Sequence, residues 1–432
     1  MKEFLKTARE MRSFLILWFT QALSGLGSAM TSYALVIRSY MDEGSALKTA
    51  LLMVCSYAPY VLLSVFAGAL SDKWNKKRIM LVSDLVAALT TVYILYLIRT
   101  DSLKMIHLYL VNIVSGLMNT FQQPASEVVI TSILPRKHYQ RVGGLKYLAN
   151  SASSILTPVL ATAVLAFGGI ESVIAFDLFT FVIAFLSLLF LIRVPEIEKQ
   201  EREKESLLKS AAAGIRYLKK ERGILSLILF LAGINLVASM YNAAFPAMML
   251  SVGGETAMGV VNTVTGVTML LGSIAASFVK TPKSRVKAIW LCLMLSMCTE
   301  NLFLALGKNL YVWCIGAFLG WISIPLMNAN LEAVMRLTIP VEIQGRVYAA
   351  RNSFQFFTIP VGYLLGGFLV DAVFEPLMAK TGGNTVWNTL FGTGKGSGCA
   401  MFFFILWLMG ILVCLLFRKN KEIAKLDKRI QE

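Results

Sequence analysis

Residues 401–417 read MFFFILWLMGILVCLLF, a run with no charged residue and, apart from one Cys, no polar side chain. Such a run can cross the apolar core of a lipid bilayer as one α-helix, because a helix satisfies its backbone hydrogen bonds internally. Outward from this run, the chain contains eleven more apolar stretches of about twenty residues. We predict spans at residues 13–37, 46–70, 79–99, 106–126, 142–167, 172–192, 224–250, 259–279, 288–306, 310–334, 347–370 and 399–417. The sequence thus predicts an all-α polytopic membrane protein with twelve transmembrane helices.

The composition of the chain excludes several other classes of protein. Of 432 residues, 56% are hydrophobic and only 15% are charged, which leaves too little polar surface for a water-soluble fold. The net charge of +16 does not predict a nucleic-acid partner, because long apolar stretches separate the basic residues. The Cys and His residues lack metal-ligand spacing, no GxxxxGK(S/T) loop is present, and no catalytic groups cluster at one depth. We therefore expect no metal, no cofactor and no enzymatic activity.

The basic residues predict the orientation of the chain in the membrane. Lys and Arg are held on the cytoplasmic side of spanning helices. All but seven of the 41 Lys and Arg residues lie in the termini and in the loops after even-numbered spans. The seven on the opposite side are Arg38, Lys48, Arg99, Lys104, Lys308, Lys380 and Lys395. We therefore expect a multi-pass protein of the cell (cytoplasmic) membrane, surrounded by the lipid bilayer, with both termini in the cytoplasm.

A charged segment near the middle divides the chain into two halves. It begins with mostly charged residues and continues with apolar residues at helical spacing, which predicts an amphipathic helix on the membrane surface. A lipid-binding switch is the alternative. The two halves of the sequence are weakly similar: when the chain is aligned with itself at a shift of 205 residues, Glu127 aligns with Glu332 and Pro135 with Pro340. Repeats of one orientation are typical of transporters whose substrate site lies between the halves. We predict two six-helix bundles, residues 1–192 and 224–432, joined by the linker 193–223.

Polar residues recur at helical spacing in the first, fourth, seventh and tenth predicted spans. Such residues should face protein or water, because lipid tails offer no hydrogen-bonding partner. Because polar residues recur in every third helix, the sequence predicts a central cavity that is lined by these helices and suited to an organic small-molecule substrate. The alternative is that the same residue types form hydrogen bonds between helices. The predicted cavity residues are Gln21, Ser28, Asn112, Asn119, Gln122, Asn235, Asn242, Asn328 and Asn330.

Few acidic residues lie at membrane depth, where an unpaired charge costs about 3 kcal/mol. Asp84 and Asp177 lie about one turn or more into the third and sixth spans, where an interface and a helix N-terminus can hold a charge. Glu300 lies deeper, about twelve residues into the ninth span. We consider Glu300 and Asp177 candidate proton sites. A structural role is favoured for both Asp residues, and the ninth span is not among the cavity-lining helices.

The loop after the second predicted span carries a family motif. Residues 68–78 read GALSDKWNKKR and resemble the G-x-x-x-D-(R/K)-x-G-(R/K)-(R/K) loop of the major facilitator superfamily. The resemblance implies a fold of two six-helix bundles and a cytoplasmic gate whose contacts break on opening. Asn75 stands where the family usually has Gly, and Asn is the side chain that best tolerates the left-handed turn that a Gly would serve. The implied gate residues are Gly68, Asp72, Lys73, Lys76, Lys77 and Arg78, with Glu127 as an acidic partner at the end of the fourth span.

Shorter motifs resemble one branch of that family. Residues 153–162, SSILTPVLAT, resemble the antiporter pattern G-x-x-x-G-P-x-x-G-G, with small residues in place of Gly and Pro158 as a helix bend. The fragments IAFD at 174–177 and NAAFP at 242–246 resemble the macrolide-exporter branch of the drug:proton antiporters. One departure is Asn112, four residues before a Gly, where many proton-coupled exporters carry Arg.

The resemblance implies a secondary active transporter. We expect a monomer that exports hydrophobic or amphipathic small molecules by alternating access, in exchange for protons. An uptake carrier, or a lipid or siderophore transporter of the same fold, is one alternative. A non-transporting membrane receptor or scaffold is another, although it would need neither the polar stripes nor the gate loop.

Overall fold

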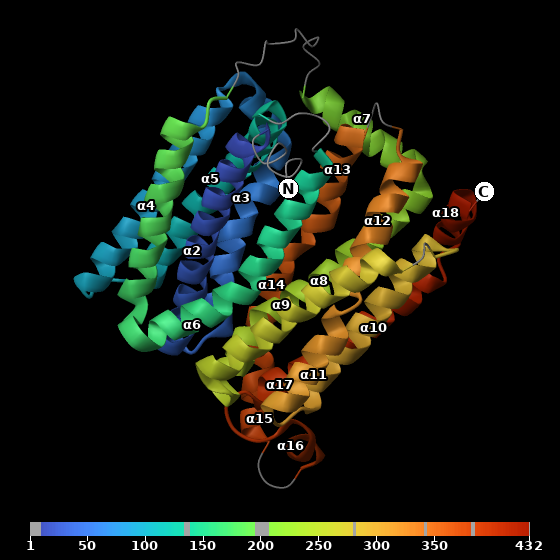
Figure 1. Ribbon diagram of the computed structural model, residues 1–432. Coiled ribbons are helices and arrows are strands. Elements are labelled where there is room, and N and C mark those ends of the chain that lie inside the picture. Colours follow the sequence, from blue (N-terminus) through green and yellow to red (C-terminus); the bar gives the residue numbers. More distant parts are fainter. Residues whose placement is uncertain are drawn as a thin grey trace. The chain divides into compact units, whose positions relative to one another are not determined.

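The computed structural model describes residues 10–133, 139–194, 207–279, 282–340, 344–381 and 385–431. All regular secondary structure in these residues is helical (Figure 1). The chain forms two compact units, Met1–Val36 with Cys55–Leu207, and Ile37–Val54 with Leu208–Glu432. The second unit thus includes the end of the first spanning helix and the start of the second. The predicted bundle boundaries at 192 and 224 stay a prediction.

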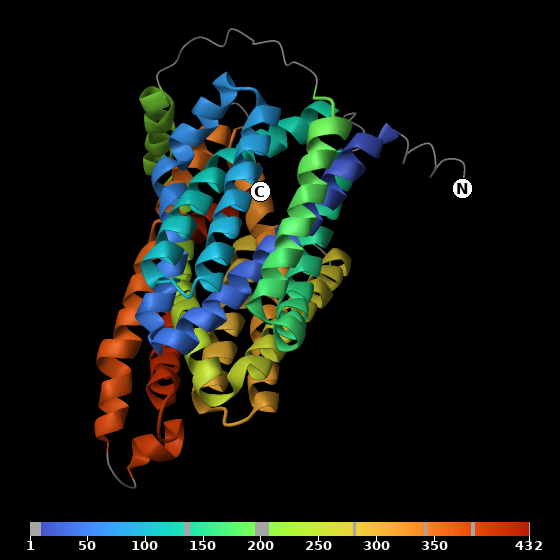
Figure 2. The same ribbon diagram turned by 90° about the vertical axis from the view of Figure 1, so that its left-hand side faces the viewer.

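The first unit contains most of the first six predicted spans. Figures 1 and 2 show its helices lying side by side along their lengths. The fifth and sixth spans form one continuous element that changes direction at Gly169, whose φ of 67° is disfavoured for residues with a side chain. The helices are α2 (Arg12–Glu43), α3 (Ala46–Lys73), α4 (Lys76–Arg99), α5 (Met105–Ile133), α6 (Tyr139–Leu186) and the π-helix η2 (Ser187–Leu191).

The second unit contains the remaining six spans. Its elements are α7 (Leu207–Lys220), α8 (Arg222–Val252), α9 (Gly254–Phe278), α10 (Arg285–Leu306), α11 (Leu310–Trp321), α12 (Ile324–Thr338), α13 (Gln344–Phe356), α14 (Thr358–Leu369), the π-helix η4 (Val370–Phe374), α15 (Glu375–Lys380), α16 (Val386–Phe391), α17 (Ser397–Arg418) and α18 (Lys421–Gln431). The amphipathic helix predicted in the linker is α7. The short helices α15, α16 and α18 were not predicted.

Two predicted spans of the second unit are interrupted. The tenth span consists of α11 and α12, and the eleventh consists of α13, α14 and η4. Helix α11 ends at Trp321, four residues before Pro325, and α13 ends at Phe356, four residues before Pro360. A Pro has no N–H to donate to the carbonyl four residues earlier, so one backbone hydrogen bond is missing at each break. The same loss does not end a helix at Pro59, Pro124, Pro158 or Pro246, which lie inside continuous helices.

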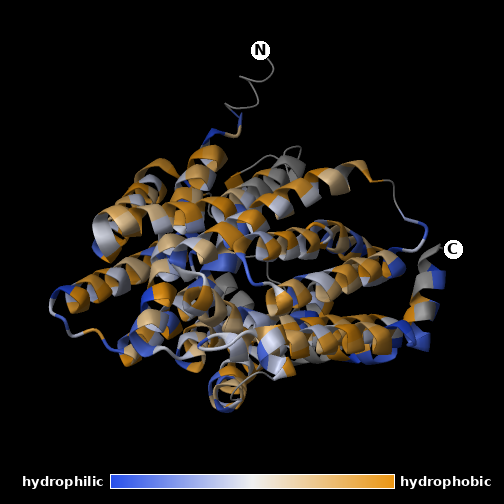
Figure 3. Cartoon of the chain, turned by 90° about the horizontal axis from the view of Figure 1, so that it is seen from below, coloured by the Kyte–Doolittle hydropathy of each residue, from blue (hydrophilic) through white to orange (hydrophobic). Residues whose placement is uncertain are grey.

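The described helices support twelve crossings. Ten segments are long and apolar enough to span a membrane, and one of them, Ala149–Leu191, contains two crossings because of the break at Gly169. The remaining crossing is α5, whose stripe of Asn, Gln and Ser residues lowers its mean hydropathy. Hydrophobic residues run along the helices, and hydrophilic residues gather toward helix ends and loops (Figure 3). The predicted twelve-helix membrane fold is confirmed.

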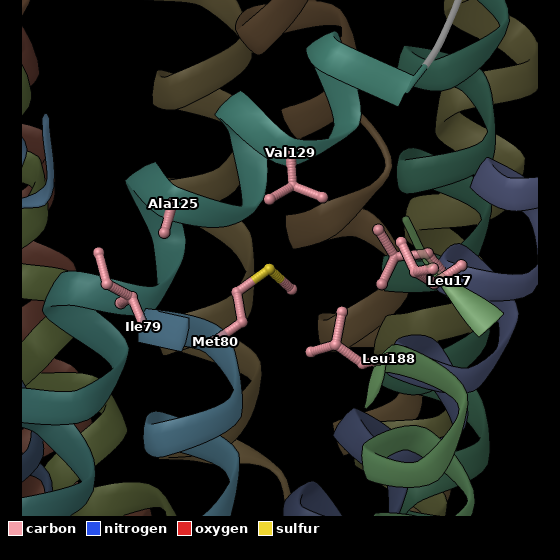
Figure 4. Close-up of a cluster of buried hydrophobic side chains, with 7 residues drawn as sticks. Leu17, Ile79, Met80, Ala125, Val129 and Leu188 are labelled. Carbon is pink, nitrogen blue, oxygen red and sulfur yellow. The ribbon is translucent and has the colours of Figure 1, made fainter. Parts of the chain in front are cut away.

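A cluster of buried apolar side chains joins four elements of the first unit. Leu17 from α2, Val129 from α5 and Leu188 from η2 surround Met80 from α4 (Figure 4). Inside a bilayer, van der Waals contact rather than the release of water holds such helices together. Because Met80 lies in the second turn of α4, the cluster also fixes the turn that precedes this helix.

Helices α3 and α5 approach each other closely at Gly116. A Cβ atom at this position would lie 2.3 Å from the carbonyl oxygen of Ser56 and 3.2 Å from Cγ of Pro59, both in α3. Only a residue without a side chain fits between the two backbones. Gly116 therefore sets the distance between the second and fourth spans.

We expect Gly116→Leu to destabilise the protein, because α3 and α5 must separate to admit the side chain. Overpacking of this kind costs about 1–3 kcal/mol, which a lower melting temperature of the detergent-purified protein should reveal. Gly25→Leu in α2 is the matched control, since a Cβ at Gly25 would meet no heavy atom within 4 Å. Equal melting temperatures for the two variants would contradict the close approach.

Candidate transport site

Asp84 of α4 is hydrogen-bonded by side chains from two neighbouring helices. Gln21 of α2 donates to its Oδ2 over 3.1 Å, and Gln122 of α5 donates to its Oδ1 over 2.5 Å. Both Gln residues belong to the predicted cavity set. The structure brings them together on one acceptor, so this carboxylate links three helices of the first unit.

Asp177, in the second half of α6, faces α2. Ser28 of α2, another predicted cavity residue, donates from Oγ to Oδ1 of Asp177 over 2.9 Å. The two helices can approach because Gly27 has no side chain: a Cβ there would lie 2.9 Å from Cα of Asp177. The carboxylate is buried at this contact.

Glu300 lies in the middle of α10 and is only 5% exposed. Tyr241 of α8 donates from its hydroxyl to Oε1 over 2.6 Å, and Trp321 of α11 donates from Nε1 to the same oxygen over 2.7 Å. Gly320 allows this approach, because a Cβ there would lie 2.7 Å from Cβ of Glu300. Although Glu300 belongs to the ninth span, its carboxylate faces the seventh and tenth.

The three carboxylates share one arrangement. Each acid stands on the third, sixth or ninth span, and the five donors described above stand on the first, fourth, seventh or tenth. Within the part of the chain that the structure describes, none of the three forms an ion pair with Lys or Arg. A carboxylate that faces only neutral donors can exchange a proton without breaking an ion pair.

The other predicted cavity residues fall into two groups. The first group donates to backbone carbonyl oxygens at 2.9–3.1 Å and comprises Asn112, Asn235 and Asn330. The second group has exposed side chains and comprises Asn119, Asn242 and Asn328. An exposed amide on a spanning helix should meet water or another polar surface, because lipid cannot satisfy it. A substrate-binding role for these residues stays a prediction.

The gate loop is described in part. Helix α3 continues to Lys73, so the turn before α4 consists of Trp74 and Asn75 alone. The side chains of Asp72 and Lys73 and the surroundings of Gly68 lie outside the described residues. The gate role of these three residues stays a prediction.

Asn75 does not adopt a left-handed conformation. Its φ of −65° and ψ of 117° are those of extended backbone, and its Oδ1 accepts a hydrogen bond from the backbone N of Arg78 over 3.1 Å. Asn75 therefore caps the N-terminus of α4, which a Gly cannot do with a side chain.

Lys77 connects the gate loop to the end of the sixth span. Its Nζ donates to the carbonyl oxygens of Leu189 and Ile192, over 2.9 and 2.7 Å. These carbonyls lie at a helix C-terminus, where partners are lacking and the helix dipole favours a cation. Lys77 thus fastens α4 to η2.

The remaining predicted gate residues lie on α4 and α5. Lys76 is half-buried and Arg78 is exposed. Glu127 lies inside α5, six residues before its end at Ile133, and not at the end of the helix as expected. The gate role of these residues stays a prediction. So does the predicted bend at Pro158, which lies inside α6.

A fourth carboxylate, which the sequence analysis did not single out, caps a helix in the second unit. Asp371 of η4 accepts hydrogen bonds from Oγ of Ser45 over 2.5 Å and from the backbone N atoms of Ala46 and Leu47 over 3.0 and 2.9 Å. These donors form the N-terminus of α3, where the helix dipole favours an anion. Gly367 allows the contact, because a Cβ there would lie 2.5 Å from Cα of Leu47. The eleventh span is thereby joined to the start of the second.

Comparisons with known proteins agree with this architecture. The family model described as Major Facilitator Superfamily matches residues 17–241, more than half of the chain. Macrolide efflux protein A of Streptococcus pyogenes is 22% identical over 372 residues, which cover 83% of this chain and 90% of the relative. The multidrug efflux pump Tap of Mycolicibacterium fortuitum is 23% identical over 373 residues, covering 83% and 89%. The enterobactin exporter EntS of Citrobacter koseri is 21% identical over 291 residues, covering 65% and 66%.

Solved structures support the same fold. A crystal structure of the nucleoside transporter NupG matches with a TM-score of 0.67 at 14% identity, covering 94% of this chain and 98% of that one. A bacterial homologue of the human lysosomal transporter Spinster matches with a TM-score of 0.60 at 13% identity, covering 97% and 96%. The chain therefore belongs to the major facilitator superfamily and is a secondary membrane transporter, not an enzyme.

Proposed function

We propose that this transporter exports hydrophobic or amphipathic small molecules of the macrolide and drug type, by alternating access and in exchange for protons. Relatives named as macrolide and multidrug efflux proteins match more than four-fifths of the chain. In the proposed orientation both termini lie in the cytoplasm, as the distribution of basic residues predicts.

The observation that carries the proton-coupled proposal is the set of three carboxylates held by neutral donors, of which Asp177 and Glu300 are buried and Asp84 is half-buried. A proton-driven exporter needs a group that gains and loses a proton as the helices around it rearrange. Glu300 fits best, because Tyr241 and Trp321 bring the seventh and tenth spans to one carboxylate oxygen. A change of protonation there would alter hydrogen bonds to two spans that are predicted to line the cavity.

Alternating access also needs a contact that closes one side and can open again. The contact between Asp371 and the start of α3 can close and open again, because it consists of hydrogen bonds from two backbone N–H groups and one hydroxyl. The predicted orientation places it on the side opposite the termini. We assign it the role of a closing contact on that side.

Export of a siderophore is the second candidate function. It is favoured by the enterobactin exporter among the relatives, which covers a smaller share of the chain than the macrolide efflux protein. A catecholate siderophore is polar and anionic at its iron-binding groups, whereas a macrolide is largely apolar. The two functions are therefore separable by substrate.

Inside-out membrane vesicles that carry the protein provide the test. With an interior-acid proton gradient, we expect a radiolabelled macrolide or a fluorescent lipophilic cation to accumulate in the vesicle lumen. A protonophore should remove the accumulation, and vesicles without the protein should show none. A catecholate siderophore serves as the competing substrate. If no lipophilic compound accumulates, the drug-export proposal is rejected. If accumulation persists in the presence of the protonophore, proton exchange is rejected.

A further inference from the structure

A cavity of about 210 Å³ lies at one end of the second unit, among α8, α10, α17 and α18. Leu227, Phe230, Phe417 and Ile423 give it an apolar wall, and the exposed side chains of Lys287 and Arg418 complete it. A cavity with an apolar wall and two cations suits a ligand that has a hydrocarbon part and an anionic part.

One of the two cations is held in place by an aromatic side chain. The guanidinium group of Arg418 lies over the ring of Trp290, 5.1 Å from its centre. Nε1 of Trp290 donates to the carbonyl oxygen of Cys414 over 2.7 Å, which fixes the ring against α17. Trp is enriched at the boundary between the apolar core of a membrane and its headgroups. Since α17 ends at Arg418 and α10 begins at Arg285, the cavity lies at such a boundary.

The wall formed by α18 is fixed as well. Asn420 caps this helix, because its Oδ1 accepts from the backbone N of Glu422 over 2.9 Å. Leu426 of α18 is 4% exposed and lies against Gly223, where a Cβ would be 2.9 Å from Cβ of Leu426. The cavity is thus enclosed by helices with defined contacts and does not depend on a loose terminus.

Two acids at the starts of α8 and α18, which enclose the cavity, have cationic partners. Glu221 pairs with Arg429 over 2.9 Å, and Glu422 pairs with Lys425 over 2.8 Å. The hydrogen bond from Lys425 lowers the pKa of Glu422, so this carboxylate stays ionised within its own pair. Among the described residues, neither Lys287 nor Arg418 forms an ion pair. The cavity therefore offers two cations without a counter-ion.

We propose that this cavity is a binding site for an anionic phospholipid of the cytoplasmic leaflet. The phosphate lies at Lys287 and Arg418, and the start of an acyl chain lies along Phe230 and Phe417. Anionic lipids of that leaflet are attracted to basic residues at the ends of spanning helices. Inorganic phosphate would leave the apolar wall unused, and the cationic headgroup of a zwitterionic lipid would be repelled by the two side chains.

Fluorescence quenching of the full-length protein in nanodiscs tests the site. Phosphatidylglycerol with brominated acyl chains, which quench Trp fluorescence, is titrated into phosphatidylcholine discs. The quenching that is seen in the wild type but not in Trp290→Phe comes from Trp290 and reports lipid at the cavity. We expect half-maximal quenching at a low mole fraction of the anionic lipid. The double variant Lys287→Gln with Arg418→Gln should need about a twenty-five-fold higher fraction, since each basic side chain contributes about five-fold.

The matched control removes the same charge outside the cavity. Lys283→Gln combined with Lys419→Gln changes two exposed basic residues that do not line it, and we expect quenching like that of the wild type. Equal quenching by brominated phosphatidylglycerol and brominated phosphatidylcholine would overturn the proposal. So would equal loss in the two double variants, or relief of quenching by millimolar inorganic phosphate alone, which would indicate a site for a free anion. None of these readouts depends on transport.

Discussion

Vesicles that carry Glu300→Gln are expected to lose gradient-driven accumulation of substrate and to fall to the level of vesicles without the protein. Gln keeps the size of Glu and an oxygen that can accept from Tyr241 and Trp321, so both hydrogen bonds can persist. It cannot release a proton. The same change should leave exchange of labelled for unlabelled substrate without a gradient intact, because exchange requires no net movement of protons.

The two readouts separate a proton-carrying role from a structural one. Tyr241→Phe is the matched control, since it removes one donor to Glu300 but keeps the carboxylate, and we expect it to retain most gradient-driven transport. Full gradient-driven transport by Glu300→Gln would exclude this residue as a proton carrier. Loss of both driven transport and exchange in a protein with an unchanged melting temperature would assign Glu300 to substrate binding instead.

The spans of this protein could be predicted from the sequence because length and hydropathy are local properties. Gly169 falls between the predicted spans 142–167 and 172–192, and the break occurs there. Two other interruptions coincide with a Pro, although Pro59, Pro124 and Pro246 lie inside uninterrupted helices, so a Pro alone does not predict a break. Pro325 and Pro360 lie inside predicted spans, and each marks a helix end four residues upstream.

The partners of the carboxylates could not be predicted in the same way. Tyr241 and Glu300 are 59 residues apart in sequence, and Gln21 and Asp84 are 63 apart. Whether such residues meet depends on how each helix is rotated about its axis, which the packing of the whole unit decides.

The residues of the predicted polar stripes have two different environments in the structure. Gln21 and Gln122 form hydrogen bonds between helices, through Asp84, whereas Asn119, Asn242 and Asn328 are exposed. The interpretation of hydrogen bonds between helices therefore applies to the two Gln residues, and the cavity role of the three exposed Asn residues stays a prediction. The spacing of residues in the sequence predicts which residues share a face of a helix, but not whether that face contacts another helix or water.

Asp371→Ala is expected to open the end of the second unit at which α3 begins. The carboxylate accepts from Ser45, Ala46 and Leu47, and a hydrogen bond to a charged group contributes about 1.5–3 kcal/mol. The loss of a single such bond would shift an opening equilibrium about tenfold. The readout is the labelling rate of Ala50→Cys by a membrane-impermeant maleimide added outside intact cells, measured at this site by peptide mass spectrometry.

Position 50 reports opening because Ala50 is 2% exposed and packs with Ala243 and Tyr363 of the second unit. The matched control is Glu375→Ala. Glu375 accepts from the backbone N atoms of Gly396 and Cys399 at the start of α17, a helix cap of the same kind that does not involve α3. Both variants should lower the melting temperature, but only Asp371→Ala should accelerate labelling, by about tenfold. Equal labelling rates in the two variants would show that the Asp371 contact stabilises the fold without closing this side of the transporter.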